Sequence, residues 1–162
     1  MNELDKALAI SLSGAEAEAA VARMNEQIAE WGMVLPAAPP FVCDFGLGDF
    51  GNVGEIETWI ANEVEPGYCG KFLFVLDGQT CPLHHHKTKH ETFYITKGRV
   101  RMICDGKTFE MKRGDVLPVA PGVVHSFTGI GAALLLEVSM PCIIDDNFFA
   151  NPKIPIGGNY EG

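Results

Sequence analysis

The sequence predicts a mainly β protein, built as a sandwich or barrel of short strands, with an N-terminal helical extension. From Glu55 onward, short apolar runs alternate with turn residues, which is the pattern of an all-β fold. Residues 13–31 instead carry apolar side chains at the three- and four-residue spacing of an amphipathic helix. With 162 residues, the chain is long enough to bury the core of one domain.

The main N-terminal helix is predicted over Ser13 to Trp31. Ser13 and Glu16 fit a capping box at its start, and Gly32 is placed to end it. Its apolar face consists of Val21, Met24, Ile28 and Trp31. We expect this face to pack on the barrel, and a dimer contact is the alternative. A weaker helical turn is predicted over residues 3–10.

Changes in composition divide the chain into three parts. Residues 1–40 form the helical extension and a linker, in which the prolines at positions 36, 39 and 40 exclude regular structure. Residues 41–140 form the barrel. Residues 141–162 form a C-terminal arm that packs on the barrel or on a partner subunit, and we assign no chemistry to it.

A series of short strands is predicted within the barrel. The strands span Glu55–Asn62, Tyr68–Leu76, Cys81–His86, Glu91–Lys97, Val100–Cys104, Lys107–Met111, Asp115–Val119, Val124–Thr128 and Ala133–Met140. The pair Asp105-Gly106 is a strong signal for a two-residue hairpin. The alternate residues Val100, Met102 and Cys104 share one face of their strand, so we expect that face to be buried.

The strongest chemical signal is a group of histidines with one acid. His84 and His86 are two residues apart, so in an extended segment they point to the same side of the sheet. Glu91 begins the next strand and can face the same cavity, while His125 follows a Pro-Gly turn further along the chain. Three imidazole nitrogens and one carboxylate oxygen form a ligand set for a first-row transition metal. We therefore expect a metal site made of His84, His86, Glu91 and His125.

These residues carry a resemblance to a known superfamily. The first cupin motif, G-x5-H-x-H-x4-E-x6-G, is matched at each fixed position, which are Gly78, His84, His86, Glu91 and Gly98. The second motif, G-x5-P-x-G-x2-H-x3-N, is matched at Gly114, Gly122 and His125, while Ala120 and Gly129 replace its proline and asparagine. The resemblance implies a cupin double-stranded β-helix, a jelly-roll barrel, over roughly residues 54–140.

Two further ionisable residues fall near this site in the predicted fold. Glu137 interrupts the apolar run of residues 132–138, and a buried carboxylate is costly unless it has a cation, a donor or a water-filled cavity. We favour a cavity-facing acid or base near the metal over an outward-facing glutamate. Lys89 shares the face of Glu91 if that strand extends backward. For Lys71, a rim charge and a cavity cation both remain open.

Blocks around these residues look like the cupin D-lyxose isomerases. The blocks cover residues 67–71, 78–82, 89–93, 121–127 and 137–139. The resemblance implies that a free aldose and its ketose are interconverted through a cis-enediol, as D-lyxose with D-xylulose or D-mannose with D-fructose. It also implies a divalent metal, usually Mn²⁺, with Zn²⁺, Fe²⁺, Ni²⁺ or Co²⁺ as alternatives.

The roles that we expect in such a reaction fall to two side chains. Glu137 is the expected base, and Lys89 is expected to move the hydroxyl proton or to stabilise the enediolate. A metal-dependent cupin dioxygenase or decarboxylase is an alternative, and a non-catalytic sugar-binding cupin is another. The isomerase is favoured because Lys89 and Glu137 add proton-transfer groups that oxygen chemistry does not need.

Composition limits the partners and the compartment. The formal charge of −9 argues against nucleic acid and anionic membranes, since both attract a positive face. The five cysteines are odd in number and form no Cys-x-x-Cys pair, so they indicate reduced thiols. The acidic start of the chain lacks the basic region of a signal peptide. We therefore expect a cytoplasmic protein, a small-molecule sugar as its partner, and a homodimer.

Overall fold

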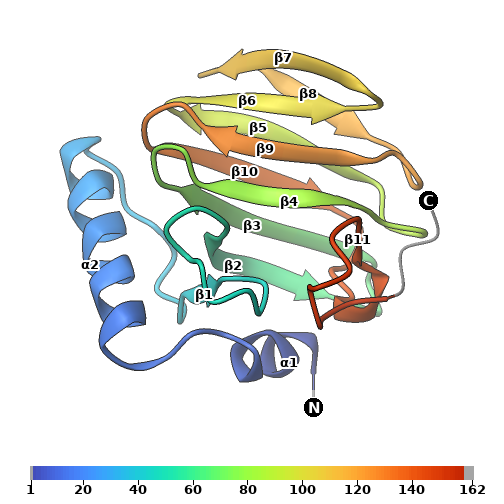
Figure 1. The fold of residues 1–162 in the computed structure, drawn as a ribbon, viewed down its shortest axis with the longest axis horizontal. Helices are drawn as coiled ribbons and strands as arrows, with labels where there is room; N and C mark the ends of the chain where they lie inside the picture. The colour runs from blue at the N-terminus through green and yellow to red at the C-terminus, as the bar shows by residue number, and fades with distance from the viewer. Residues whose placement is uncertain (1, 159–162) are drawn as a thin grey trace.

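The computed structural model describes residues 2–158 of the chain. Two antiparallel sheets stack face to face and enclose the core, as Figure 1 shows. Within the described residues, one sheet has the strand order β1-β2-β3-β10-β5-β8 and the other has the order β11-β4-β9-β6-β7. This mainly β arrangement, with helices at its N-terminus, confirms the predicted fold class.

The elements follow the chain in a simple order. The helices are α1 (Glu3–Ala9) and α2 (Gly14–Glu30). The strands of the first sheet are β1 (Phe41–Cys43), β2 (Glu55–Glu63), β3 (Tyr68–Val75), β5 (Glu91–Lys97), β8 (Val116–Val119) and β10 (Ala133–Ser139). Those of the second are β4 (Thr80–His85), β6 (Arg99–Cys104), β7 (Lys107–Lys112), β9 (His125–Gly129) and β11 (Phe148–Phe149). The short helix η1 (Ile144–Asp146) precedes β11.

Each strand expected from the sequence is present, with ends displaced by at most one residue. Asp105 and Gly106 both have positive φ, at 51° and 71°, as the predicted hairpin requires. Val100 and Met102 are fully buried, as their alternation indicated, while Cys104 is partly buried. Strands β1 and β11 were not predicted, because strands of two or three residues are too short to show an alternating pattern.

Helix α2 packs on the outer face of the six-stranded sheet, which agrees with the packing expected for its apolar face. Its buried face meets Val42, Ile56 and Phe74 in one hydrophobic cluster through Ala17, Ala20, Met24 and Ile28. Gly32, at φ 64°, ends the helix, where its amide and that of Met33 bond back to the last turn.

The predicted capping box at Ser13 is wrong. The Ser13 side chain makes no capping hydrogen bond within the described part of the chain. Gly14, the first residue of α2, has a φ of 72°, so the chain enters the helix without aligning the serine hydroxyl with the first amides. A capping box is present instead in α1, where Asn2 accepts from the amide of Asp5 and Asp5 accepts from the amide of Asn2.

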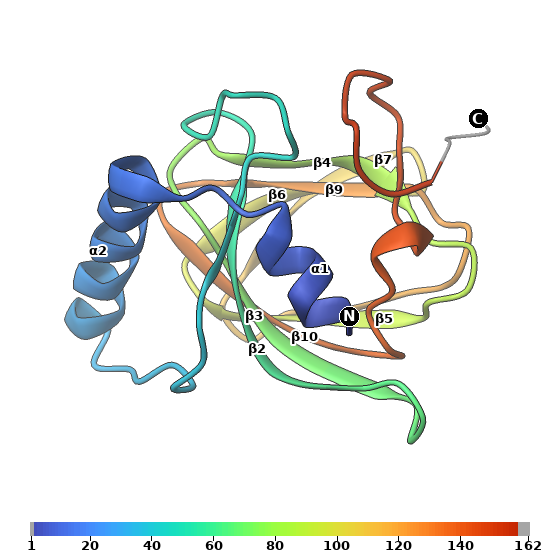
Figure 2. The same ribbon diagram turned by 90° about the horizontal axis from the view of Figure 1, so that it is seen from below.

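Helix α1 lies across the edge between the two sheets, beside the C-terminal arm, as the view in Figure 2 shows. Ala7 is completely buried in the cluster that fills the barrel. The Glu3 carboxylate accepts the amide of Ile144 at 2.7 Å and so ties α1 to η1. Within the described residues, no helix is long and apolar enough to cross a membrane.

The C-terminal arm contributes to the interior, although no chemistry was assigned to it from the sequence. The Asp146 carboxylate accepts the backbone amides of Lys87, Thr88 and Lys89 at 3.0–3.2 Å, and the Thr88 hydroxyl at 2.7 Å. The loop that follows His86 is therefore held in place by a residue sixty positions later in the chain.

Gly98 allows a close approach that a side chain would prevent. It has a φ of 73°, and a Cβ added there would clash with the backbone carbonyl of Ala132. We expect Gly98→Ala to lower the free energy of unfolding by about 3 kcal/mol or more, through strain and overpacking. Gly106→Ala is the control, because its φ of 71° is similar but its Cβ would meet open space. Urea unfolding should show a loss of only about 1–2 kcal/mol there, and equal losses would contradict the clash.

Asp146→Ala should loosen the loop of residues 87–89. Loss of the shared acceptor is expected to cost about 2 kcal/mol and to speed amide exchange in this loop, whereas exposed Asp145→Ala should change neither. Burial by itself raises the pKa of Asp146, but the bonds from Thr88, Lys87 and Lys89 outweigh it and lower that pKa. The stabilisation is therefore complete above the ordinary aspartate pKa and is lost as pH falls through the lowered value. Identical exchange rates in both variants would show that the tie is unimportant.

Candidate active site

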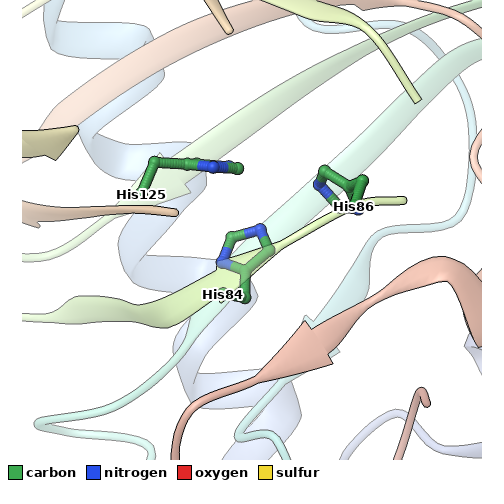
Figure 3. Close-up of side chains that lie close together, drawn as sticks. All are labelled: His84, His86 and His125. Carbon is green, nitrogen blue, oxygen red and sulfur yellow. The ribbon is translucent and has the colours of Figure 1, made fainter. Parts of the chain in front are cut away.

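The three histidines expected from the sequence come together inside the barrel. His84 and His86 lie on and just after β4, and His125 begins β9 on the neighbouring strand (Figure 3). One nitrogen of each ring lies within 4.8 Å of one nitrogen of the others. A register shift between Cys81 and His84 turns the strand, so that the side chains of Cys81 and His84 both face the interior.

The other nitrogen of each ring bonds to a backbone carbonyl, and this fixes the tautomer. The Nδ1 atoms of His84, His86 and His125 lie 2.7, 2.9 and 3.0 Å from the carbonyl oxygens of Pro82, Asp146 and Val123. A carbonyl can only accept, so each Nδ1 carries a proton. In the neutral ring, Nε2 then has a free lone pair, which is the form that binds a metal.

Glu91 completes the group. Its Oε1 atom lies 2.8 Å from Nε2 of His125 and 3.3 Å from Nε2 of His86. These three atoms are buried and have no hydrogen-bond partner among the described residues. Lone pairs that face one another at this distance need a cation between them, either a proton or a metal ion. The donor set therefore fits a divalent transition metal held by three imidazoles and one carboxylate.

The ionisation of these groups suits metal binding. Burial, with the neighbouring His125 and His86, lowers the pKa of His84 well below its usual value, so the ring is neutral. Burial also lowers the pKa of His86. For Glu91, burial raises the pKa, but the charge of Lys89 and the close approach of His125 and His86 hold that pKa well below its usual value. Neutral imidazoles and an ionised carboxylate are the ligating forms.

Lys89 and Glu137 lie beside this group, both less than 5% exposed. Lys89 Nζ donates to Glu137 Oε1 at 2.9 Å and lies 2.7 Å from Glu91 Oε2. Burial lowers the pKa of Lys89, but the carboxylates of Glu137 and Glu91 outweigh it and raise that pKa above its ordinary value. Ser139 also donates to Glu137 Oε1, at 2.9 Å. The carboxylate of Glu137 is thus inside the cavity, as the cost of burying it led us to expect.

Lys71 is a cavity cation and not a rim charge. It is 5% exposed, and its Nζ lies 2.9 Å from Glu57 Oε2 and 3.5 Å from Glu137 Oε2. Trp59 Nε1 also donates to Glu57 Oε2, at 2.7 Å. Ionic side chains therefore run from Glu91 through Lys89, Glu137 and Lys71 to Glu57, with charges of alternating sign.

Sequence reasoning did not find the residues that β2 contributes. Glu55, Glu57 and Trp59 line the same cavity as His84 and His86. In isolation, glutamates that alternate with Ile56 and Thr58 indicate a strand with its acidic face in water. The structure reverses this assignment, because α2 covers the side of Ile56 and the acidic side faces the barrel interior. Whether the acidic side of β2 faces water or the barrel interior depends on which side α2 covers, and the sequence of β2 alone does not specify which side that is.

Comparison with known proteins gives one matching family and two related isomerases. The family model described as Cupin domain matches residues 71–139. The D-lyxose/D-mannose isomerase of Thermosediminibacter oceani is 28% identical, over 70% of this chain and 77% of that protein. The D-lyxose ketol-isomerase of Cohnella laeviribosi is also 28% identical, over 70% of this chain and 76% of that protein.

A solved structure extends the fold similarity to nearly the whole chain. The L-ribose isomerase of Cellulomonas parahominis superimposes with a TM-score of 0.71 at 13% identity, and covers 93% of this chain and 98% of that chain. The helical extension and the arm are therefore part of a shared fold. Residues 71–139 therefore match the cupin domain family, and the chain is similar to the D-lyxose isomerases.

Proposed function

We propose that this protein is a metal-dependent isomerase that interconverts a free aldose and its ketose. One observation carries the proposal: Lys89 bridges Glu137 and Glu91, so a carboxylate suited to proton transfer lies one side chain away from the metal-ligand group. The names of the two related isomerases support the same reaction class, with D-lyxose and D-mannose as the first substrates to test.

The metal would be held by His84, His86, Glu91 and His125, with Mn²⁺ as our preferred ion. When bound, a divalent ion supplies a Lewis acid that polarises the sugar carbonyl and orients the neighbouring hydroxyl. The chain prepares for this by fixing all three ring orientations through Nδ1. It also excludes water, since the four ligand residues are at most 7% exposed.

Glu137 is the proposed base. It takes the proton from the carbon next to the carbonyl and returns that proton to the former carbonyl carbon, with a cis-enediol between the two transfers. The proton of the neighbouring hydroxyl moves to the former carbonyl oxygen, so the ketose forms without net gain or loss of protons. Lys71 and Lys89 each hold one of its oxygens, which limits the carboxylate to one orientation. As an ammonium beside the reacting oxygens, Lys89 stabilises the negative charge that develops when the proton leaves.

A homodimer is part of the proposal. Ile60 on β2, Val138 on β10 and Met140 just after β10 are about half exposed. Apolar groups at this density on a sheet face favour contact with another protein surface. A second copy of the chain is the partner that we propose for them.

Metal binding can be tested without any substrate. After treatment with a chelator, Mn²⁺ at about a hundredfold above its Kd should stabilise the wild type by about 2.7 kcal/mol, a rise in Tm of roughly 5–10 °C. His125→Ala should lose this rise, because one ligand is gone. His90→Ala is the control, since His90 is exposed in the same segment. A full rise in His125→Ala would remove His125 from the ligand set.

Glu137→Gln should lower kcat for aldose–ketose conversion by about 10²–10⁴-fold while Mn²⁺ binding stays intact. In D₂O, the wild type should place solvent deuterium at C1 of the ketose, because the transferred proton passes through Glu137. The exposed Glu110→Gln is the matched control. Turnover within a few-fold of wild type would exclude Glu137 as the base. Turnover that depends on dissolved oxygen would point to a dioxygenase instead.

A further inference from the structure

A group of polar side chains in the cavity lies beyond the proton transfer described above, and of its members only Lys71 contacts the proposed base. We call Glu55, Glu57, Trp59 and Lys71 the β2 subsite, because three of the four lie on β2 and Lys71 pairs with Trp59 from β3. All four line the cavity that His84, His86 and Glu137 also line.

Most of the β2 subsite is held rigidly. Glu57 Oε2 accepts both Trp59 Nε1 at 2.7 Å and Lys71 Nζ at 2.9 Å. Lys71 Nζ also lies 5.7 Å from the centre of the Trp59 ring and 3.5 Å from Glu137 Oε2. The indole is therefore fixed in the cavity wall, and the same lysine connects it to the proposed base.

Glu55 is the member whose bonding is incomplete. It is only 5% exposed, and its Oε2 atom is buried with no hydrogen-bond partner among the described residues. Burial and the charge of Glu57 raise the pKa of Glu55 well above its usual value, which favours the protonated acid, and its side chain also bonds to those of Glu57 and Cys81. A neutral carboxylic acid has one donor and acceptor capacity, which is the complement of a hydroxyl group.

A purely structural role does not account for these residues. A buried polar atom without a partner destabilises the fold, and apolar residues of similar size usually replace buried ionic groups without loss. A leucine at position 55 would pack against Cys43 and Cys81, which line the same part of the cavity. The acid instead fits a ligand that brings its own hydroxyl.

We propose that the β2 subsite binds the hydroxyl-bearing end of the sugar that is remote from the carbonyl, with Glu55 bonded to the terminal hydroxyl and the Trp59 ring against the carbon chain. This inference rests on the proposed function. His84, His86 and Glu91 line the same cavity as the β2 subsite, so one ligand can contact both groups.

The subsite also indicates which sugars are excluded. Lys71 is the one cation of the subsite, and it already pairs with Glu57 and Glu137. A phosphate at the remote end of a sugar would meet these carboxyl groups without a free cation. The substrate class is therefore a neutral, unphosphorylated aldose.

The test removes the contact between Glu55 and the terminal hydroxyl, either by changing the protein or by changing the sugar. Calorimetric titrations into the Mn²⁺-loaded protein use two pairs of sugars, D-lyxose with 5-deoxy-D-lyxose and D-mannose with 6-deoxy-D-mannose. At least one parent sugar should bind the wild type about tenfold more tightly than its deoxy partner. Glu55→Leu should bind the parent about tenfold more weakly than wild type, and should no longer distinguish it from the deoxy sugar. Glu55→Gln, which keeps a donor and an acceptor, should retain most of the difference.

Two controls separate this loss from damage to the fold. Glu63→Leu makes the same change at an exposed position of β2 and should bind like wild type. The Tm of Glu55→Leu should equal or exceed that of wild type, since an unsatisfied acid is replaced by an apolar side chain. A lower Tm with unchanged sugar affinities would assign Glu55 a structural role and overturn the proposal.

The other outcomes distinguish the subsite from the reaction. If sugars are isomerised but Glu55→Leu still distinguishes the deoxy partner, the subsite is wrong and the isomerase stands. If Glu55→Leu loses the distinction between the parent and the deoxy sugar but no ketose forms, the subsite stands and the isomerase is wrong. If no sugar of either pair binds the Mn²⁺-loaded wild type, both are overturned.

Discussion

Buried charges need partners, and in this barrel the partners are arranged strand by strand across the inner face of one sheet. Glu91, Lys89, Glu137, Lys71 and Glu57 alternate in sign, and each ion lies within 3.5 Å of the next. Any one of these side chains would be costly to bury alone, because ionised groups lose their hydration in an apolar interior. Together they allow a charged reaction site to exist within a core that phenylalanine and leucine otherwise fill.

The histidine group depends on backbone geometry in a different way. Each ring is oriented by a carbonyl oxygen, and for His86 that carbonyl belongs to Asp146 of the C-terminal arm. The carboxylate of the same residue fixes the loop that leads to Lys89. One residue of the arm therefore positions both a proposed metal ligand and the lysine that connects the ligand group to Glu137. This explains how an arm with no evident chemistry of its own can influence the site.

Enclosure follows from the same architecture. Helix α1 and the arm cover the edge between the two sheets, and Glu3 ties one to the other (Figure 2). The residues of the site are consequently almost inaccessible to water, which strengthens every electrostatic interaction among them. A polyhydroxylated ligand in such a space has to exchange its bonds with water for bonds with the protein. Side chains with both donor and acceptor capacity, such as a neutral Glu55, meet that requirement.

The sequence by itself determined the strands, their turns and the histidine-glutamate group. These features are local: alternation, Asp105-Gly106 and the His84-His86 spacing each depend on residues a few positions apart. It also led to Glu137 and Lys89, because a carboxylate within an apolar run is conspicuous and a lysine two positions before Glu91 shares its face.

Only the tertiary structure decided the rest. Which face of β2 turns inward depends on where α2 packs, and the role of Asp146 depends on the path of the arm. The choice for Lys71 between rim and cavity was settled by pairing with strands distant in the chain. The capping box at Ser13 failed because the φ of Gly14 is a property of how the chain enters the helix. Pairing between distant segments is fixed by the global packing of apolar faces, and no short stretch of sequence contains that information.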